Sequence, residues 1–134
     1  MKNLFIVITL FVAWSNAAFA HTALSKSTPA EGEVLSTAPT SIQLVYTESV
    51  RLLRAELLLI RNASSEKVDI DFEPSSTSAE QYSVTLPHLT NGQYRIEWAV
   101  MGADGHPVQG ALSFGIGMTP AHEQNEESHS HGAH

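Results

Sequence analysis

Apolar residues recur at every second position through much of this chain, and this period of two is its most constraining feature. Large apolar side chains occupy alternate positions in the segments 42–46, 82–86, 94–100 and 112–116. Successive side chains of a β-strand point to opposite faces, so this alternation indicates strands with one buried face. The chain is therefore expected to fold mainly from strands that cover a shared core.

Two further apolar segments and the turns between them complete the predicted fold. Residues 55–60 predict a more fully buried strand, and residues 67–72 predict another. Short strands at this spacing, with no convincing helix, are typical of an antiparallel sandwich or a small barrel. We favour an all-β fold, a Greek-key antiparallel β-sandwich of about seven strands, immunoglobulin-like or cupredoxin-like. The predicted turns lie at 29–32, 39, 62–65, 74–78, 91–92 and 104–107.

Both ends of the chain differ from this central region. Residues 1–20 have the pattern of a secretory signal peptide, with Lys2, an apolar run and a final Ala-Phe-Ala. Cleavage after Ala20 predicts export, and we expect a periplasmic location. Residues 21–117 then form one domain. The tail, residues 118–134, contains four of the seven histidines and nothing able to anchor in a core, so we expect it to be disordered.

Charge and composition exclude several classes of partner. Removing Lys2 with the signal leaves six Lys and Arg against fourteen Asp and Glu, a net charge of −8. Nucleic acids and anionic membranes both require basic patches, so neither is expected as a partner. No segment after the signal approaches the ~20 apolar residues of a membrane span, so no insertion is expected after cleavage. The chain has no cysteine, so a metal site would use His, carboxylates, Met or an amine.

Candidate metal ligands occur at the predicted mature terminus and in one turn. Cleavage would make His21 the first residue, which offers an α-amine and a ring nitrogen to one ion. Cu(II) favours such nitrogen donors in a tetragonal plane. Asp104 and His106 lie two residues apart in Asp-Gly-His-Pro, so in extended geometry both point the same way. That tetrapeptide also makes a good turn with no further purpose.

Several sequence blocks together resemble the CopC family of periplasmic copper-binding proteins. The blocks occur in the family's order and cover roughly residues 21–117. They are His21, Ser27-Thr28-Pro29-Ala30-Glu31-Gly32, Ile42-Gln43-Leu44, Thr47-Glu48-Ser49, the segment 91–98 from Asn91 to Trp98, and Asp104-Gly105-His106-Pro107.

The resemblance implies a Cu(II) site and a role in copper resistance or homeostasis. Its ligands would be the amine and ring of His21, the side chains of Asp104 and His106, and Glu48 as a further candidate. The protein would be a non-catalytic carrier or buffer of Cu(II), with a CopD-like inner-membrane copper transporter as the suggested partner. Some family members carry a second, Met-rich Cu(I) site, but this chain keeps only Met101 and Met118 after processing.

Two other functions fit parts of this pattern. A copper-dependent monooxygenase also uses an N-terminal His and a second His, but it needs an open copper position and a broad substrate face. A metal-free β-sandwich for adhesion or assembly would make the histidines incidental. The tail residues His122, His129, His131 and His134 fit either loose metal binding or a merely soluble tail.

Overall fold

A computed structural model of the protein describes residues 24–117, which form seven β-strands. This part of the chain contains no helix with the length and hydropathy needed to cross a membrane. The predicted signal peptide and the tail lie outside the described residues. The strands are β1 (Leu24–Thr28), β2 (Val34–Leu35), β3 (Ser41–Arg61), β4 (Ser64–Val68), β5 (Ala79–Thr85), β6 (Gly92–Met101) and β7 (Pro107–Ile116).

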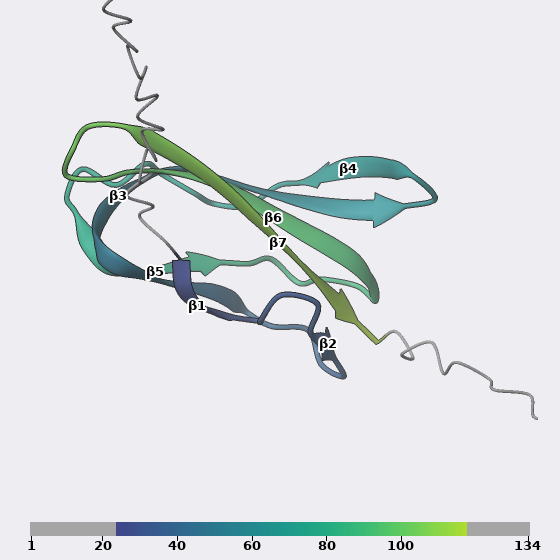
Figure 1. Cartoon of the computed structure of the whole chain (residues 1–134). Helices are drawn as coiled ribbons and strands as arrows, with labels where there is room; N and C mark the ends of the chain where they lie inside the picture. The colour runs from purple at the N-terminus through teal and green to yellow at the C-terminus, as the bar shows by residue number, and fades with distance from the viewer. Residues whose placement is uncertain (1–23, 118–134) are drawn as a thin grey trace, which may run out of the picture.

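The strands form one sheet that curls into two layers, and β3 belongs to both of them (Figure 1). Its first part pairs with β1 and β5, whereas its second part pairs with β4 and β6. β7 extends the second layer beside β6, and β2 adds to the far edge of β7. The prediction of an all-β sandwich with about seven strands is confirmed.

The change of layer occurs at a bend in the middle of β3. Pairing with β5 is regular up to Val45 and resumes only at Val50, and pairing with β6 shifts again between Leu52 and Arg54. Such interruptions let a strand bend and twist more strongly. Residues 47–49 at the bend are exposed, while Val50 and Leu52 beyond it are buried again. The bend therefore forms one end of the sandwich.

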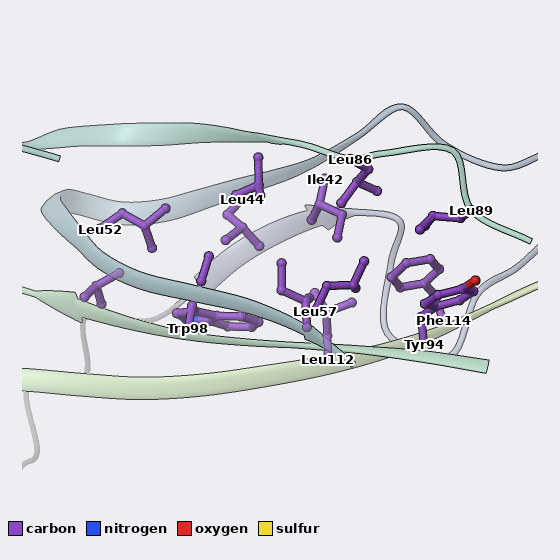
Figure 2. Close-up of a cluster of buried hydrophobic side chains, with 14 of the residues drawn as sticks. Ile42, Leu44, Leu52, Leu57, Leu86, Leu89, Tyr94, Trp98, Leu112 and Phe114 are labelled. Carbon is purple, nitrogen blue, oxygen red and sulfur yellow. The ribbon is translucent and has the colours of Figure 1, made fainter. Parts of the chain in front are cut away.

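The core lies between the two layers and is built from the alternating residues. Ile42 and Leu44 from one layer point toward Leu57 and Trp98 from the other, as Figure 2 shows. At the end of the core away from Leu52, the rings of Tyr94 and Phe114 stack with centroids 5.6 Å apart. Full burial of such side chains stabilises a fold by about 1.5–3 kcal/mol each. Residues 55–60, predicted to be more fully buried, instead alternate, because Glu56, Leu58 and Ile60 face outward and are half-buried.

Two local predictions differ from the structure. The strand predicted at 67–72 lies at Ser64–Val68, and residues 69–72 form no strand. The cause is a two-residue hairpin turn at Asn62 and Ala63, both with positive φ (46° and 66°), which lets pairing with β3 restart at Ser64. In addition, β2 pairs with β7 in parallel, so the sheet is mixed rather than wholly antiparallel.

The contact between Trp98 and Gly110 tests this packing. Trp98 pairs with Gly110, and a Cβ at position 110 would lie only 2.5 Å from atoms of the indole ring. Overpacking of this kind typically costs about 1–3 kcal/mol. We expect Gly110→Ala to lower the free energy of unfolding by that amount in urea denaturation. Gln109→Ala, an exposed change on the same strand, is the control and should shift it by less than about 0.5 kcal/mol.

The hairpin turn gives a second prediction, in which a substitution stabilises the fold. Ala63 has a left-handed backbone, which costs a residue with a Cβ about 1–2 kcal/mol but costs glycine little. We expect Ala63→Gly to raise the free energy of unfolding by up to about 1 kcal/mol. The control is Ala103→Gly, because Ala103 has no positive φ and its replacement only loosens the unfolded chain. Equal effects of the two changes would contradict the turn geometry.

Candidate metal centre

The loop between β6 and β7 carries two of the predicted ligands, Asp104 and His106. It leaves β6 at Met101 and enters β7 at Pro107, which are paired residues. Gly105 donates its backbone N–H to the carbonyl oxygen of Gly102 (3.1 Å), and its φ of +77° favours glycine. The loop is thus a tight turn, as its composition predicted, and this turn projects both side chains from the end of the hairpin.

The side chains of Asp104 and His106 lie together in this loop. The backbone N–H of His106 donates to Oδ1 of Asp104 (3.0 Å), and Nδ1 of His106 lies 3.4 Å from Oδ2. Both side chains are open to solvent, with 55% of Asp104 and 83% of His106 exposed. Nδ1 of the His106 ring contacts Asp104, whereas Nε2 of the same ring is not involved in this contact. The turn therefore presents a carboxylate and an imidazole to one region of solvent.

The hydrogen bonds also set the charge of Asp104. The backbone N–H of His106 is the main cause that holds the pKa of the Asp104 carboxyl below its usual range, and the His106 side chain adds to this. A donor hydrogen bond favours the ionised form of a carboxyl group. Asp104 therefore stays ionised to lower pH than an ordinary aspartate, and the carboxylate is the form that binds metal ions.

Glu48 and the start of β1 belong to the same end of the molecule as this loop. Glu48 lies in the exposed bend of β3, two residues after Tyr46, which pairs with Leu24 at the start of β1. Beyond the bend, Arg51 pairs with Met101, the last residue before the loop. In Figure 1 the bend of β3 and the β6–β7 loop lie at the left end. Glu48 already takes part in an interaction of its own.

The described residues alone do not assemble a complete metal site. Within residues 24–117, no three His, Asp or Glu side chains come together in a group able to hold an ion. Asp104 and His106 are brought together, while Glu48 does not join them in such a group. His21 lies outside the described residues, three positions before Leu24. Its role as a ligand stays a prediction.

Sequence reasoning missed Tyr46 as a polar feature beside this end. Its position in the alternation predicted a buried side chain, and it is 3% exposed. Its hydroxyl has no hydrogen-bond partner in the described structure, and burial, followed by the neighbouring Tyr82, raises the pKa of this phenol. The two rings pack edge to face with centroids 6.5 Å apart. Periodicity reports which side chain is buried, but it does not report whether the polar end finds a partner.

Comparison with known proteins identifies the family. The CopC domain matches residues 24–117. The chain is 34% identical over 108 residues to copper resistance protein C of Xanthomonas campestris pv. juglandis, covering 76% of this chain and 84% of that protein. It is also 32% identical over 115 residues to the copper transport protein CutJ of Bacillus subtilis, covering 84% of this chain but 21% of CutJ. This chain thus spans about a fifth of CutJ.

Solved structures agree with this assignment. The copper resistance protein PcoC of Escherichia coli, described as methionine-rich, superposes with a TM-score of 0.59 at 26% identity over 72% of this chain and 99% of PcoC. CopC of Methylosinus trichosporium OB3b has the same fold, with a TM-score of 0.58 at 18% identity over 72% of this chain and 93% of that one. This protein belongs to the CopC family of copper resistance proteins.

The lowered pKa of Asp104 gives a testable pH dependence. The pKa of Asp104 is lower in the folded protein than in the unfolded chain. The ionised carboxylate therefore stabilises the fold at pH values above the unfolded pKa, and this stabilisation is lost as the pH falls through the folded pKa. We expect carbon-13 NMR titration of the metal-free protein to give a pKa for Asp104 below the ordinary ~3.9. His106→Ala should largely keep the shift, because the backbone N–H remains. An ordinary pKa in the unaltered protein would show that the hydrogen bond does not form.

Proposed function

We propose that this protein is a non-catalytic periplasmic carrier or buffer of Cu(II). Membership of the CopC family supports a role in copper resistance. The observation that carries the proposal is the paired Asp104 and His106, held by one turn at the end of the sandwich where β1 begins. The copper ion is the cargo of the protein rather than a cofactor for a reaction.

The proposed ligands are the amine and ring of His21, His106 and Asp104, with Glu48 as a further candidate. Signal cleavage after Ala20 would leave the amine three residues before Leu24, within about 11 Å of that residue when extended. Leu24 pairs with Tyr46 next to the bend that holds Glu48. Three nitrogens and a carboxylate oxygen would make the tetragonal plane that Cu(II) favours.

The low methionine content supports Cu(II) rather than Cu(I) as the ion. PcoC is described as methionine-rich, whereas this chain contains three methionines, Met1, Met101 and Met118. Thioether sulfur is a soft ligand that selects Cu(I). A site of imidazole, amine and carboxylate lacks that preference. We propose that delivery proceeds to a CopD-like transporter in the inner membrane, which would take the ion from the exposed loop.

The proposed site requires a free amino terminus, and this gives a direct test. We expect the mature protein beginning at His21 to bind one Cu(II) with a nitrogen-rich tetragonal EPR spectrum. One alanine added before His21 should remove the amine–ring chelate and weaken binding by more than about tenfold, since even outer-shell changes commonly cost 10–100-fold. In this experiment His122, His129, His131 and His134 are replaced by Asn in both forms, so that the tail cannot bind the ion.

Variants of the loop complete this test. His106→Ala and Asp104→Asn should each reduce the Cu(II) affinity and change the EPR parameters, because each removes a donor atom. His88→Ala is the matched control, since His88 is exposed and lies in the connection between β5 and β6. Equal binding by the native and the extended terminus would rule out the His21 anchor. Failure of the native form to bind tightly would overturn the copper carrier function of the domain.

A further inference from the structure

The positive charges of the domain are concentrated on the outer face of its second layer. Residues 24–117 contain six Lys and Arg and eleven Asp and Glu, a net of −5. Four of the cations, Arg51, Arg54, Lys67 and Arg95, lie on the outer face of β3, β4 and β6, with two carboxylates, Glu56 and Glu97. We call these six residues the cationic face. Its net charge is +2, so the rest of the domain carries −7.

The register of the strands defines this face. Ala99, Glu97 and Leu58 alternate with buried residues, so their side chains point outward. Arg54, Glu56 and Lys67 pair with these three residues in turn and therefore point outward as well. Arg51 and Arg95 follow the same alternation. Asp69, which follows β4, lines a hollow together with Arg54, Glu56 and Lys67, so a further carboxylate borders the cationic face there.

The cations on this face are partly engaged and still accessible. Arg54 and Lys67 contact Glu56 at 3.0 and 3.2 Å, and Arg95 contacts Glu97 at 3.1 Å. Their side chains remain 41%, 66% and 45% exposed. Exposed ion pairs contribute only about 0–1 kcal/mol, so these contacts can exchange for others at little cost.

A shallow depression crosses the cationic face next to β7. Arg54, Arg95 and Glu97 line it together with Gln109, Gly110 and Ala111 of β7. Ala111, which pairs with the outward-facing Glu97, has a short side chain, and the two arginine side chains line the depression with it. The depression therefore presents two cations to any segment that runs along β7.

We propose that the acidic tail of this chain, residues 118–134, docks on the cationic face. The tail follows β7 directly and carries Glu123, Glu126 and Glu127 with no Lys or Arg. A tethered segment has an effective local concentration in the millimolar range, so weak charge attraction is enough for binding. Other acidic partners lack this advantage, so the tail is the occupant that the chain favours.

Spacing along the chain agrees with this docking. The sheet register places Arg95, Arg54 and Arg51 level with three positions of β7. These positions lie 4, 8 and 10 residues before Gly117, at Ser113, Gln109 and Pro107 respectively. The tail carboxylates Glu123, Glu126 and Glu127 lie 6, 9 and 10 residues beyond Gly117. A tail that returns along β7 therefore brings its three carboxylates to within two positions of the levels of the three arginines.

The same geometry takes the histidine-rich end of the tail to the loop end of the molecule. Thirteen residues separate Gly117 from Ser130, a reach of about 43 Å when extended. The ten residues of β7 span only about 34 Å. Docking would therefore bring His129 and His131 next to the loop of Asp104 and His106. The docking itself needs no metal ion and is independent of the proposed copper function.

Paramagnetic NMR on the metal-free mature chain tests this docking. The chain has no cysteine, so Ser130→Cys provides one site for a nitroxide label. We expect broadening of amide signals along the outer face of β6 and β7 and in the 104–106 loop. Salt at ~1 M, where the Debye length is only ~3 Å, should abolish it. Broadening that is absent, evenly spread over the surface or insensitive to salt would overturn the proposal.

Matched charge variants separate the cationic face from net charge. Arg54→Glu with Arg95→Glu changes the face from +2 to −2 and should remove the broadening. Lys26→Glu with Arg61→Glu makes the same change in net charge away from the face and should leave it. A Gln triple variant at Glu123, Glu126 and Glu127 leaves the domain unaltered and should also remove the broadening. If the Lys26 and Arg61 variant lost the broadening as fully as the Arg54 and Arg95 variant, docking on this face would be contradicted.

A mixing experiment identifies the occupant. Spin-labelled protein without nitrogen-15 is added to nitrogen-15 protein without the label. Broadening in this mixture would mean that the tail binds a second copy, which would overturn docking within one chain. Broadening only when the label and nitrogen-15 are on the same molecule would establish it.

Discussion

One strand, β3, holds the two layers of this fold together, and the other strands are placed by their pairing with it. Its first part forms the centre of the layer with β1 and β5, and its second part lies between β4 and β6. The bend between the two parts lets residues on either side of it enter one core. Because the strand is continuous, the two layers meet at the bend, and this defines the end of the molecule at which Glu48, Asp104 and His106 lie.

The candidate metal centre follows from this arrangement. A ligand set drawn from the start of the domain, the bend of β3 and the β6–β7 loop spans more than 80 residues of sequence. Pairing of Leu24 with Tyr46 and of Arg51 with Met101 brings these segments to one end. Asp104 and His106 are exposed there and held by a turn, which suits the proposed uptake and release of an ion. A buried site would release it slowly.

Charge is unevenly distributed over the surface of the domain. The domain is acidic, yet the outer face of β3, β4 and β6 is positive, and the acidic tail begins at the end of β7 beside it. A tail bound there by charge alone would respond to salt and to metal binding by its histidines. Docking would connect the two histidine-containing parts of the chain without adding to the core.

The sequence by itself determined the all-β class, the strands at 42–46, 82–86, 94–100 and 112–116, and the Asp104–His106 pair, because periodicity and turn chemistry are local properties. It placed the strand Ser64–Val68 too late, at 67–72, because the predicted turn at 62–65 is longer than the two-residue turn Asn62-Ala63 that the chain forms. Only the tertiary structure decided the double role of β3, the cationic face and the burial of the Tyr46 hydroxyl without a hydrogen-bond partner among residues 24–117. These depend on pairing between residues distant in sequence, and such pairing leaves no local pattern.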